Sequence, residues 1–191
     1  MKTITWIFAL ILITFSSLAQ DKYSPVIKQG TKLHYFALTP DGQSVPFIAS
    51  FDSVAADYIR IGWNIEGLGT GSWVMKKASL DNGVNGFWAQ PMPDNAQELP
   101  DDQTVLLFSK AQWQSLQKNQ KADFDQTTYT VKQASEQQQL KVSGKVVDVL
   151  FLESSTGNTH IWLLNNPAFP VILKIAGNTG GHVDLELLSI E

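Results

Sequence analysis

Residues 57–65, DYIRIGWNI, are the stretch that decides the fold. Apolar side chains occupy every second position, namely Ile59, Ile61, Trp63 and Ile65. The positions between them carry Tyr58, Arg60, Gly62 and Asn64. Because successive side chains of a β-strand point to opposite faces, this alternation predicts a strand with one buried face and one face in solvent.

Strand-like segments recur on both sides of this stretch, separated by turn residues rich in Gly, Asn, Asp and Pro. We expect strands at 31–38, 45–51, 72–75, 104–108, 127–133, 139–142, 145–152, 158–164, 170–175 and 182–190. Short strands at regular spacing, without helices between them, indicate antiparallel pairing. The one helix we expect is 110–118, with Ser109 as its N-cap and Asn119 as its C-cap.

The predicted fold class is therefore mainly β. We expect a curved antiparallel sheet or a partly open β-barrel with one short helix packed against it. No repeat of fixed period and no linker divides the chain. Residues 31–191 are accordingly predicted to form a single β-rich domain, preceded by a leader at 20–30. The proline-bearing stretch 91–100 is predicted to be an irregular surface loop.

Residues 1–19 have the pattern of a cleavable signal peptide. Lys2 precedes an apolar run at 4–15, and the small residues Ser17 and Ala19 follow, which puts the cleavage site before Gln20. The run is too short to span a bilayer, which takes about 20 apolar residues. No cysteine stands at the cleavage site, so we expect no lipid anchor. The mature protein is predicted to be exported to a periplasm or the cell exterior, without a transmembrane span.

Composition narrows the possible partners. The chain has no cysteine, a net charge of −4, and Arg60 as its single arginine. A nucleic-acid-binding protein needs clustered basic side chains, so nucleic acid is not an expected partner. Without disulfides, the exported domain must be stabilised by its apolar core.

Two motifs invite a catalytic interpretation, and neither has the context that it needs. Residues 123–127 match the D-x-D-x-T nucleophile motif of a phosphatase family, but a polar, turn-like segment precedes them instead of a buried strand. We expect a solvated loop there. Residues 67–71 (GLGTG) follow a strand but do not match the dinucleotide-binding spacing, so we expect a hairpin turn. We predict no catalytic residue and no cofactor, and the balance of features leans against an enzyme.

One set of metal ligands can be drawn from the sequence. His182, Asp184 and Glu186 would share a face of the last predicted strand, and imidazole with two carboxylates is a competent ligand set. The same alternation is also typical of any surface strand. Two further histidines, His34 and His160, lie on other predicted strands, so convergence of the three would create a metal or acid–base site.

Tryptophans give the other candidate site. We expect Trp88, Trp113, Trp162 and Trp63 either to build the core or to line an apolar pocket between sheet and helix. Trp88 lies in the predicted loop region and is the first candidate for a binding contact.

Near the carboxyl end, residues 159–167 (THIWLLNNP) and 169–175 (FPVILKI) resemble a pattern of exported bacterial envelope β-domains. With the order of strands, single helix and strands, the chain is weakly similar to the periplasmic lipoprotein carriers of the LolA-like half-barrel fold. That resemblance implies a curved sheet that wraps a helix and holds acyl chains.

Three functions follow as hypotheses. The leading one is a non-enzymatic envelope protein that binds an apolar small molecule, a lipid or an envelope protein on the concave face of the sheet. The second is a secreted hydrolase with a His/carboxylate or metal site. The third is a structural or assembly domain of the outer envelope that pairs through an exposed sheet edge.

Overall fold

The computed structural model describes residues 22–178 and 182–191. The predicted signal peptide, residues 1–19, lies outside the described residues. Among the described residues, no helix has both the length and the apolar character to cross a membrane.

Strands and short helices alternate unevenly along the chain. The first half contains β1 (Lys32–Leu38), β2 (Ser44–Val54), β3 (Tyr58–Ile65), β4 (Gly69–Lys76), β5 (Asn85–Gly86), β6 (Ala96–Glu98) and β7 (Gln103–Thr104). The second half contains β8 (Lys121–Phe124), β9 (Thr127–Lys132), β10 (Lys141–Val142), β11 (Lys145–Val146), β12 (Val149–Ser154), β13 (His160–Leu164), β14 (Ile172–Ala176) and β15 (Asp184–Ile190). The helices are α1 (Lys77–Asn82), α2 (Lys110–Asn119) and the 3₁₀ turn η1 (Glu136–Gln138).

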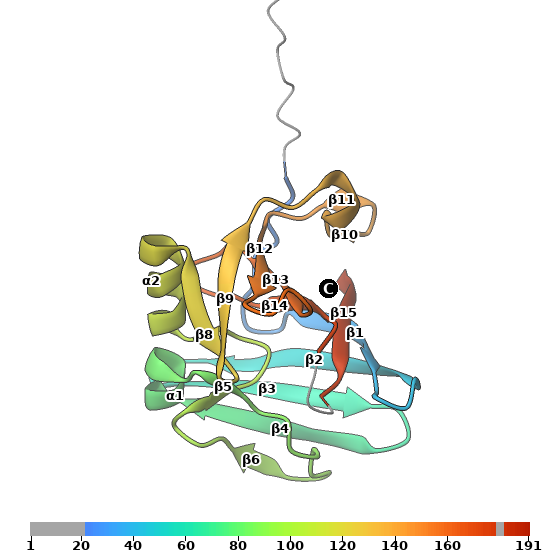
Figure 1. Ribbon diagram of the computed structural model, residues 1–191. Helices are drawn as coiled ribbons and strands as arrows, with labels where there is room; N and C mark the ends of the chain where they lie inside the picture. The colour runs from blue at the N-terminus through green and yellow to red at the C-terminus, as the bar shows by residue number, and fades with distance from the viewer. Residues whose placement is uncertain (1–21, 179–181) are drawn as a thin grey trace, which may run out of the picture.

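Eleven of the strands form one large sheet, in the order β6-β4-β3-β2-β1-β15-β14-β13-β12-β9-β8. Neighbouring strands are antiparallel except β4 and β6, which are parallel. The sheet curves without closing into a barrel, and Figure 1 shows β2, β3 and β4 crossing below the strands of the second half. The prediction of a mainly β protein with a curved antiparallel sheet is confirmed.

The alternation in residues 57–65 gives a strand, β3, with one buried face, as predicted. Ile59, Ile61 and Trp63 of β3 are buried, whereas Arg60 and Asn64 are exposed. The core lies between the inner faces of the two halves of the sheet. There the ring of Phe51, on β2, meets the ring of Phe169 edge to face, with 5.8 Å between centroids. Apolar burial between two sheet layers of this kind is the main source of folding free energy in a domain without disulfides.

Helix α2 begins where the sequence indicated. Ser109 and Gln112 form a reciprocal capping box, in which each side chain accepts a hydrogen bond from the other residue's backbone N–H. The side-chain amide of Gln112 also donates to the backbone oxygen of Asp123 over 2.7 Å, which ties the helix to β8. The helix ends one residue later than predicted, because Gln120 and not Asn119 takes the capping position, with a left-handed backbone.

The predicted strand 104–108 is wrong. Its residues are buried, as their apolar character required, but only Thr104 belongs to a strand, β7. Leu106 has φ of 58°, which breaks the extended conformation. Instead, the Leu106 carbonyl accepts a hydrogen bond from Ile172 N–H at 2.8 Å, and the segment runs as a buried loop beside β14.

Two short strands of the large sheet appear where none was expected, besides the two-residue β5. Residues 91–100, predicted as an irregular loop, include β6, which pairs with β4. Residues 121–124 form β8, an edge strand that pairs with β9. Both lie at an end of the large sheet, where the neighbouring strand supplies the pairing that a weak local pattern does not signal.

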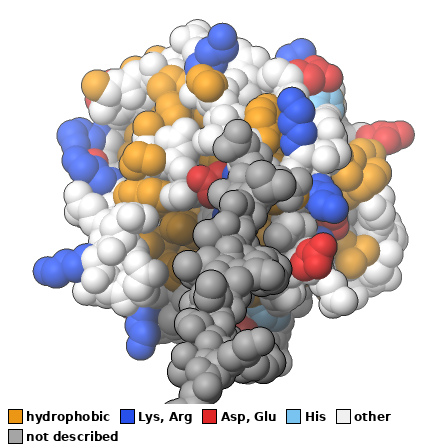
Figure 2. Space-filling model, turned by 90° about the horizontal axis from the view of Figure 1, so that it is seen from above, with side chains coloured by type: hydrophobic (Ala, Val, Ile, Leu, Met, Phe, Trp, Pro, Cys, Tyr) orange, Lys and Arg blue, Asp and Glu red, His pale blue; other side chains and the backbone are white. Residues whose placement is uncertain are grey.

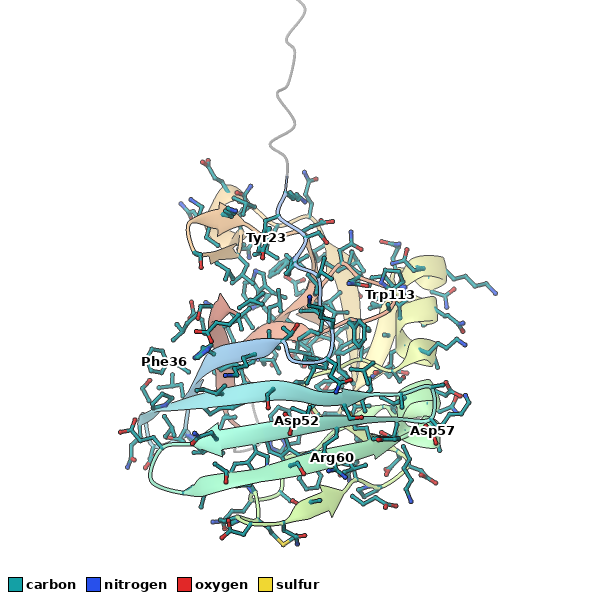
Figure 3. The ribbon with its side chains drawn as sticks, turned by 180° about the vertical axis from the view of Figure 1, so that it is seen from behind. Tyr23, Phe36, Asp52, Asp57, Arg60 and Trp113 are labelled. Atoms are coloured by element: carbon teal, nitrogen blue, oxygen red, sulfur yellow. The ribbon has the colours of Figure 1, made fainter. Side chains whose placement is uncertain are left out.

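The segment before β1 is part of the packed domain. Tyr23 makes backbone hydrogen bonds to Val146 and Asp148, and Figure 3 shows it beside the β10–β11 hairpin. Ile27 is 4% exposed and joins the core. Residues 22–30, expected to be a leader, therefore contribute to the stability of the fold.

Candidate functional site

The candidate site is an apolar cavity of about 310 Å³ beneath the loop that contains Trp88. Its walls come from four parts of the chain: the first strands of the sheet, the loop at 87–91, the buried loop at 105–106, and the segment that leads into β15. The large apolar side chains among the lining residues include Phe47, Trp73, Phe87, Trp88, Leu106 and Leu185. A concave, mainly apolar wall with few polar groups is typical of small-molecule sites, which span about 300–1,000 Å³.

Trp88 is held in the wall by a carboxylate from another element. Its indole N–H donates to Asp125 Oδ2 over 2.7 Å, and the Gly86 backbone N–H donates to Asp125 Oδ1 over the same distance. Whereas Asp125 bonds the edge of the indole, the ring of His182 stacks on one of its faces, with centroids 4.8 Å apart. Trp88 is therefore fixed on two sides by groups distant in the sequence.

The turn that carries Asp125 has an unusual backbone. Asp125 and Gln126 both have positive φ, 48° and 59°, as a two-residue hairpin turn of type I′ requires. This tight turn joins β8 to β9 and directs the Asp125 carboxylate toward the 86–88 loop. At Gly86 any side chain would collide, since a Cβ there would lie 2.7 Å from the Trp88 indole nitrogen.

Two other wall residues have unusual local features. Leu106 adopts its positive φ at the cavity wall, in a conformation that costs a branched residue free energy and that is often found at functional sites. Trp73 also lines the wall, and its indole N–H is buried without a hydrogen-bond partner among the described residues. Neither feature could be inferred from the sequence.

The four predicted tryptophans have different positions. Trp88 lines the cavity, whereas Trp63 does not line it and is buried against Trp73, with ring centroids 5.8 Å apart. Trp113 is buried on the inner face of α2, at the opposite side of the molecule from Phe36 (Figure 3). Trp162 donates its N–H to the backbone oxygen of Gln138 and does not line this cavity. Sequence reasoning missed Trp73 and Phe87.

The three predicted metal ligands make separate contacts. His182 stacks on Trp88, and the carboxylate of Asp184 accepts backbone N–H groups from Gly177 and Asn178. Glu186 pairs with Lys174 over 3.0 Å. Within residues 22–178 and 182–191, no group of three His, Asp or Glu side chains is placed to hold a metal ion. The geometry therefore gives the metal hypothesis no support.

The other two histidines lie near different carboxylates. His34 Nε2 lies 3.3 Å from a Glu191 carboxylate oxygen. His160 stacks on Phe151 with centroids 5.3 Å apart, and its Nε2 lies 3.7 Å from Glu153. The described contacts thus distribute the three histidines over different parts of the sheet and do not assemble an acid–base pair from them.

The D-x-D-x-T motif at 123–127 forms part of the β8–β9 hairpin. The prediction of a solvated loop is wrong, since Asp123 lies on β8 and Asp125 fixes the Trp88 loop. Strand β8 is antiparallel to β9 and lies at an end of the sheet, so the parallel-strand setting of a phosphatase nucleophile is not present there. The predicted hairpin turn at 67–71 is right in position but too long: residues 66–68 form the turn between β3 and β4, whereas residues 69–71 already belong to β4 and pair with β3.

On the face seen in Figure 2, the basic side chains stand apart from one another, among hydrophobic and uncharged groups. No protein-family model, curated protein or solved structure matches this chain.

Proposed function

We propose that this protein is a non-enzymatic exported binding protein that holds a small apolar molecule in the cavity beneath Trp88. The supporting observation is the fixed position of Trp88, which Asp125 and His182 hold in the cavity wall from two sides. A large aromatic side chain positioned in advance binds an apolar ligand without losing much side-chain entropy.

The size of the cavity favours a small molecule over a protein partner. At about 310 Å³ it lies at the lower end of the range for ligand sites. Residues 159–175, which carry the resemblance to the lipoprotein carriers, contribute β13 and β14 and no residue of the cavity wall. The proposed ligand therefore rests on the wall residues themselves and not on that resemblance.

The alternatives receive less support from the described residues. A hydrolase would need two of the histidines in one cleft, and each histidine has different partners. An assembly domain would need a long free sheet edge. The two ends of the sheet are β6, of three residues, and β8, of four residues, with α2 bonded to it through Gln112.

A cavity-filling variant tests the binding function. Ala37→Phe adds a ring at the wall, and we expect it to weaken the binding of an apolar fluorescent dye at least tenfold by occupying the ligand's space. The dissociation constant is measured by titration of the purified chain, residues 20–191. Ala168→Phe, on an exposed loop, is the matched control and should bind as the wild type does.

Dye binding that is absent from the wild type, or equal in wild type and Ala37→Phe, would contradict the proposal. Thermal unfolding of both variants shows whether the added ring has disturbed the fold.

Export is part of the same proposal and rests on residues 1–19. Expression of the full chain in a bacterial host should yield a protein outside the cytoplasm whose first residue is Gln20.

A further inference from the structure

The lining of the cavity is apolar where it is buried and polar where it is exposed. The buried lining residues include Phe47, Leu106 and Leu185, whose side chains are purely apolar. Gln90 is exposed and His182 is half-buried, and both line the same cavity with polar side chains. A ligand that fills the cavity therefore meets apolar surface on the inner side and polar groups on the side nearest to solvent.

His182 is held by its face, which leaves the edge of its ring unengaged. The imidazole lies nearly parallel to the Trp88 indole, with 19° between the ring planes. In the described residues, histidine–carboxylate pairs form at His34 and His160 and not at His182. Its ring nitrogens are also not among the described polar atoms that are both buried and unpaired. Among the described residues, the edge of this ring is therefore open to a hydrogen-bonding ligand.

The third polar residue of the rim is already occupied. The Thr39 hydroxyl donates to the Asp41 carboxylate and to the backbone oxygen of Gln43, and it accepts from the Gln43 backbone N–H. His182 and Gln90 are thus the rim residues that can recognise a polar group of the ligand.

The charge of the lining limits what that polar group can be. None of the described residues that line the cavity is Lys, Arg, Asp or Glu. A carboxylate or an ammonium group would lose hydration there without an opposite charge in the lining, which is costly. A neutral imidazole and an amide each offer a donor and an acceptor, and a hydroxyl group matches both because it also donates and accepts.

We infer that the ligand of the cavity is a small amphipathic molecule with an apolar body and one neutral hydroxyl group, which bonds to the ring edge of His182 and to Gln90. This inference rests on the proposed function and makes these two residues the determinants of specificity. The ligand enters with its apolar body first, and its hydroxyl group stays at the rim.

The test compares two ligands of equal carbon number on two proteins. Hexane and 1-hexanol are titrated against the wild type and His182→Phe, and dissociation constants are obtained by displacement of an apolar dye. Phe keeps an aromatic ring against Trp88 and lacks the ring nitrogens, so the ratio of the two effects isolates the hydrogen bond. We expect 1-hexanol to lose about tenfold more affinity than hexane in His182→Phe.

Two controls accompany this comparison. His160 also stacks on an aromatic ring, that of Phe151, but does not line the cavity, so His160→Phe should change neither affinity. Hexanoate and hexylamine, which have the same carbon number and a charge, should bind the wild type more weakly than 1-hexanol.

The possible outcomes separate this inference from the proposed function. Equal losses for hexane and 1-hexanol would overturn the role of His182 and leave the binding function standing. Tighter binding of hexanoate or hexylamine than of 1-hexanol would overturn the neutral polar group. No binding of any of these ligands to the wild type would overturn both proposals.

A second variant decides if His182→Phe does not fold. Gln90 is exposed, so Gln90→Leu should leave the fold intact. We expect this variant to lose about threefold more affinity for 1-hexanol than for hexane, because one hydrogen bond at the rim is removed. Equal losses for the two ligands would then overturn the inference.

Discussion

The carboxylate of Asp125 accepts two hydrogen bonds, one from the Gly86 backbone and one from the Trp88 indole, at a turn where its own backbone is left-handed. Asparagine tolerates the same backbone but offers a single, uncharged acceptor oxygen. Replacing Asp125 with Asn therefore weakens the hydrogen bonding that holds Trp88 in place, with little disturbance of the hairpin turn.

Asp125→Asn should weaken binding of the apolar dye by about tenfold, because hydrogen bonds to a charged acceptor contribute about 1.5–3 kcal/mol and one of the two is lost. Asp123→Asn is the matched control from the same motif, since Asp123 contacts Thr128 and not the Trp88 loop. Equal affinities in the two variants would show that Asp125 does not support the site.

Tyr35 supplies a prediction for alkaline solution. Complete burial raises the pKa of its phenol well above the ordinary value of about 10, and its hydroxyl donates to the Ile172 carbonyl over 2.8 Å. Above pH 10 the unfolded chain releases this proton while the folded protein retains it. The stabilisation is thus fully present below pH 10 and declines above it, by up to about 1.4 kcal/mol per pH unit.

The variant Tyr35→Phe lacks the phenol and therefore lacks this pH-dependent contribution to the free energy of unfolding. Urea unfolding below pH 10 should show the variant about 1 kcal/mol less stable, from the lost hydrogen bond. Between about pH 10 and 11 the difference should shrink as the wild type loses stability faster. Parallel curves for the two proteins across this range would contradict the prediction.

Only some of the individual site residues could be predicted from the sequence. Trp88 could be selected because it is a large aromatic residue in a loop region. Trp73 could not be separated from the other strand tryptophans, because its distinguishing property is an unpaired N–H that only the folded environment creates. The role of Asp125 was hidden for a similar reason, since its partners lie 37 and 39 residues away in the chain.

Among the elements, α2 has the clearest local cause. Ser109 and Gln112 satisfy two backbone N–H groups at its first turn, and Gln112 joins the helix to β8. Ser109→Ala should lower the free energy of unfolding by about 1 kcal/mol, as measured by urea denaturation. Ser115→Ala, in the middle of the same helix, should change it by less than about 0.5 kcal/mol. A smaller loss at position 109 than at 115 would refute the role of the cap.

The elements that could be predicted share one property. Strands such as β3 alternate apolar and polar side chains over a long run, which fixes both their conformation and their buried face. Strand β8 alternates too, but Ala122 is one of its two buried residues and gives a weak signal. The predicted strand at 104–108 does not form beyond Thr104, because a run of buried apolar residues is compatible with a strand or with a buried loop, and the positive φ of Leu106 decides between them.

For the molecule as a whole, the packing of residues 22–30 against the domain leads us to expect that they unfold together with it. Ile27→Ala removes a core side chain and should lower the free energy of unfolding by about 2–4 kcal/mol. Its neighbour Val26 is 77% exposed, so Val26→Ala should change stability by less than about 0.5 kcal/mol. Chemical denaturation of both variants tests this, and similar effects at the two positions would mean that the segment is only loosely attached.

The order of strands in the sheet also has a consequence for how the protein is made. Strand β15 is the last described strand in the chain, yet it lies between β1 and β14, near the middle of the sheet. While the chain is still on the ribosome, the two halves of the sheet lack the strand that joins them. Any part of the sheet that folds before β15 is available therefore keeps an open edge, and the complete sheet requires the pairing of β15 with β1 and β14.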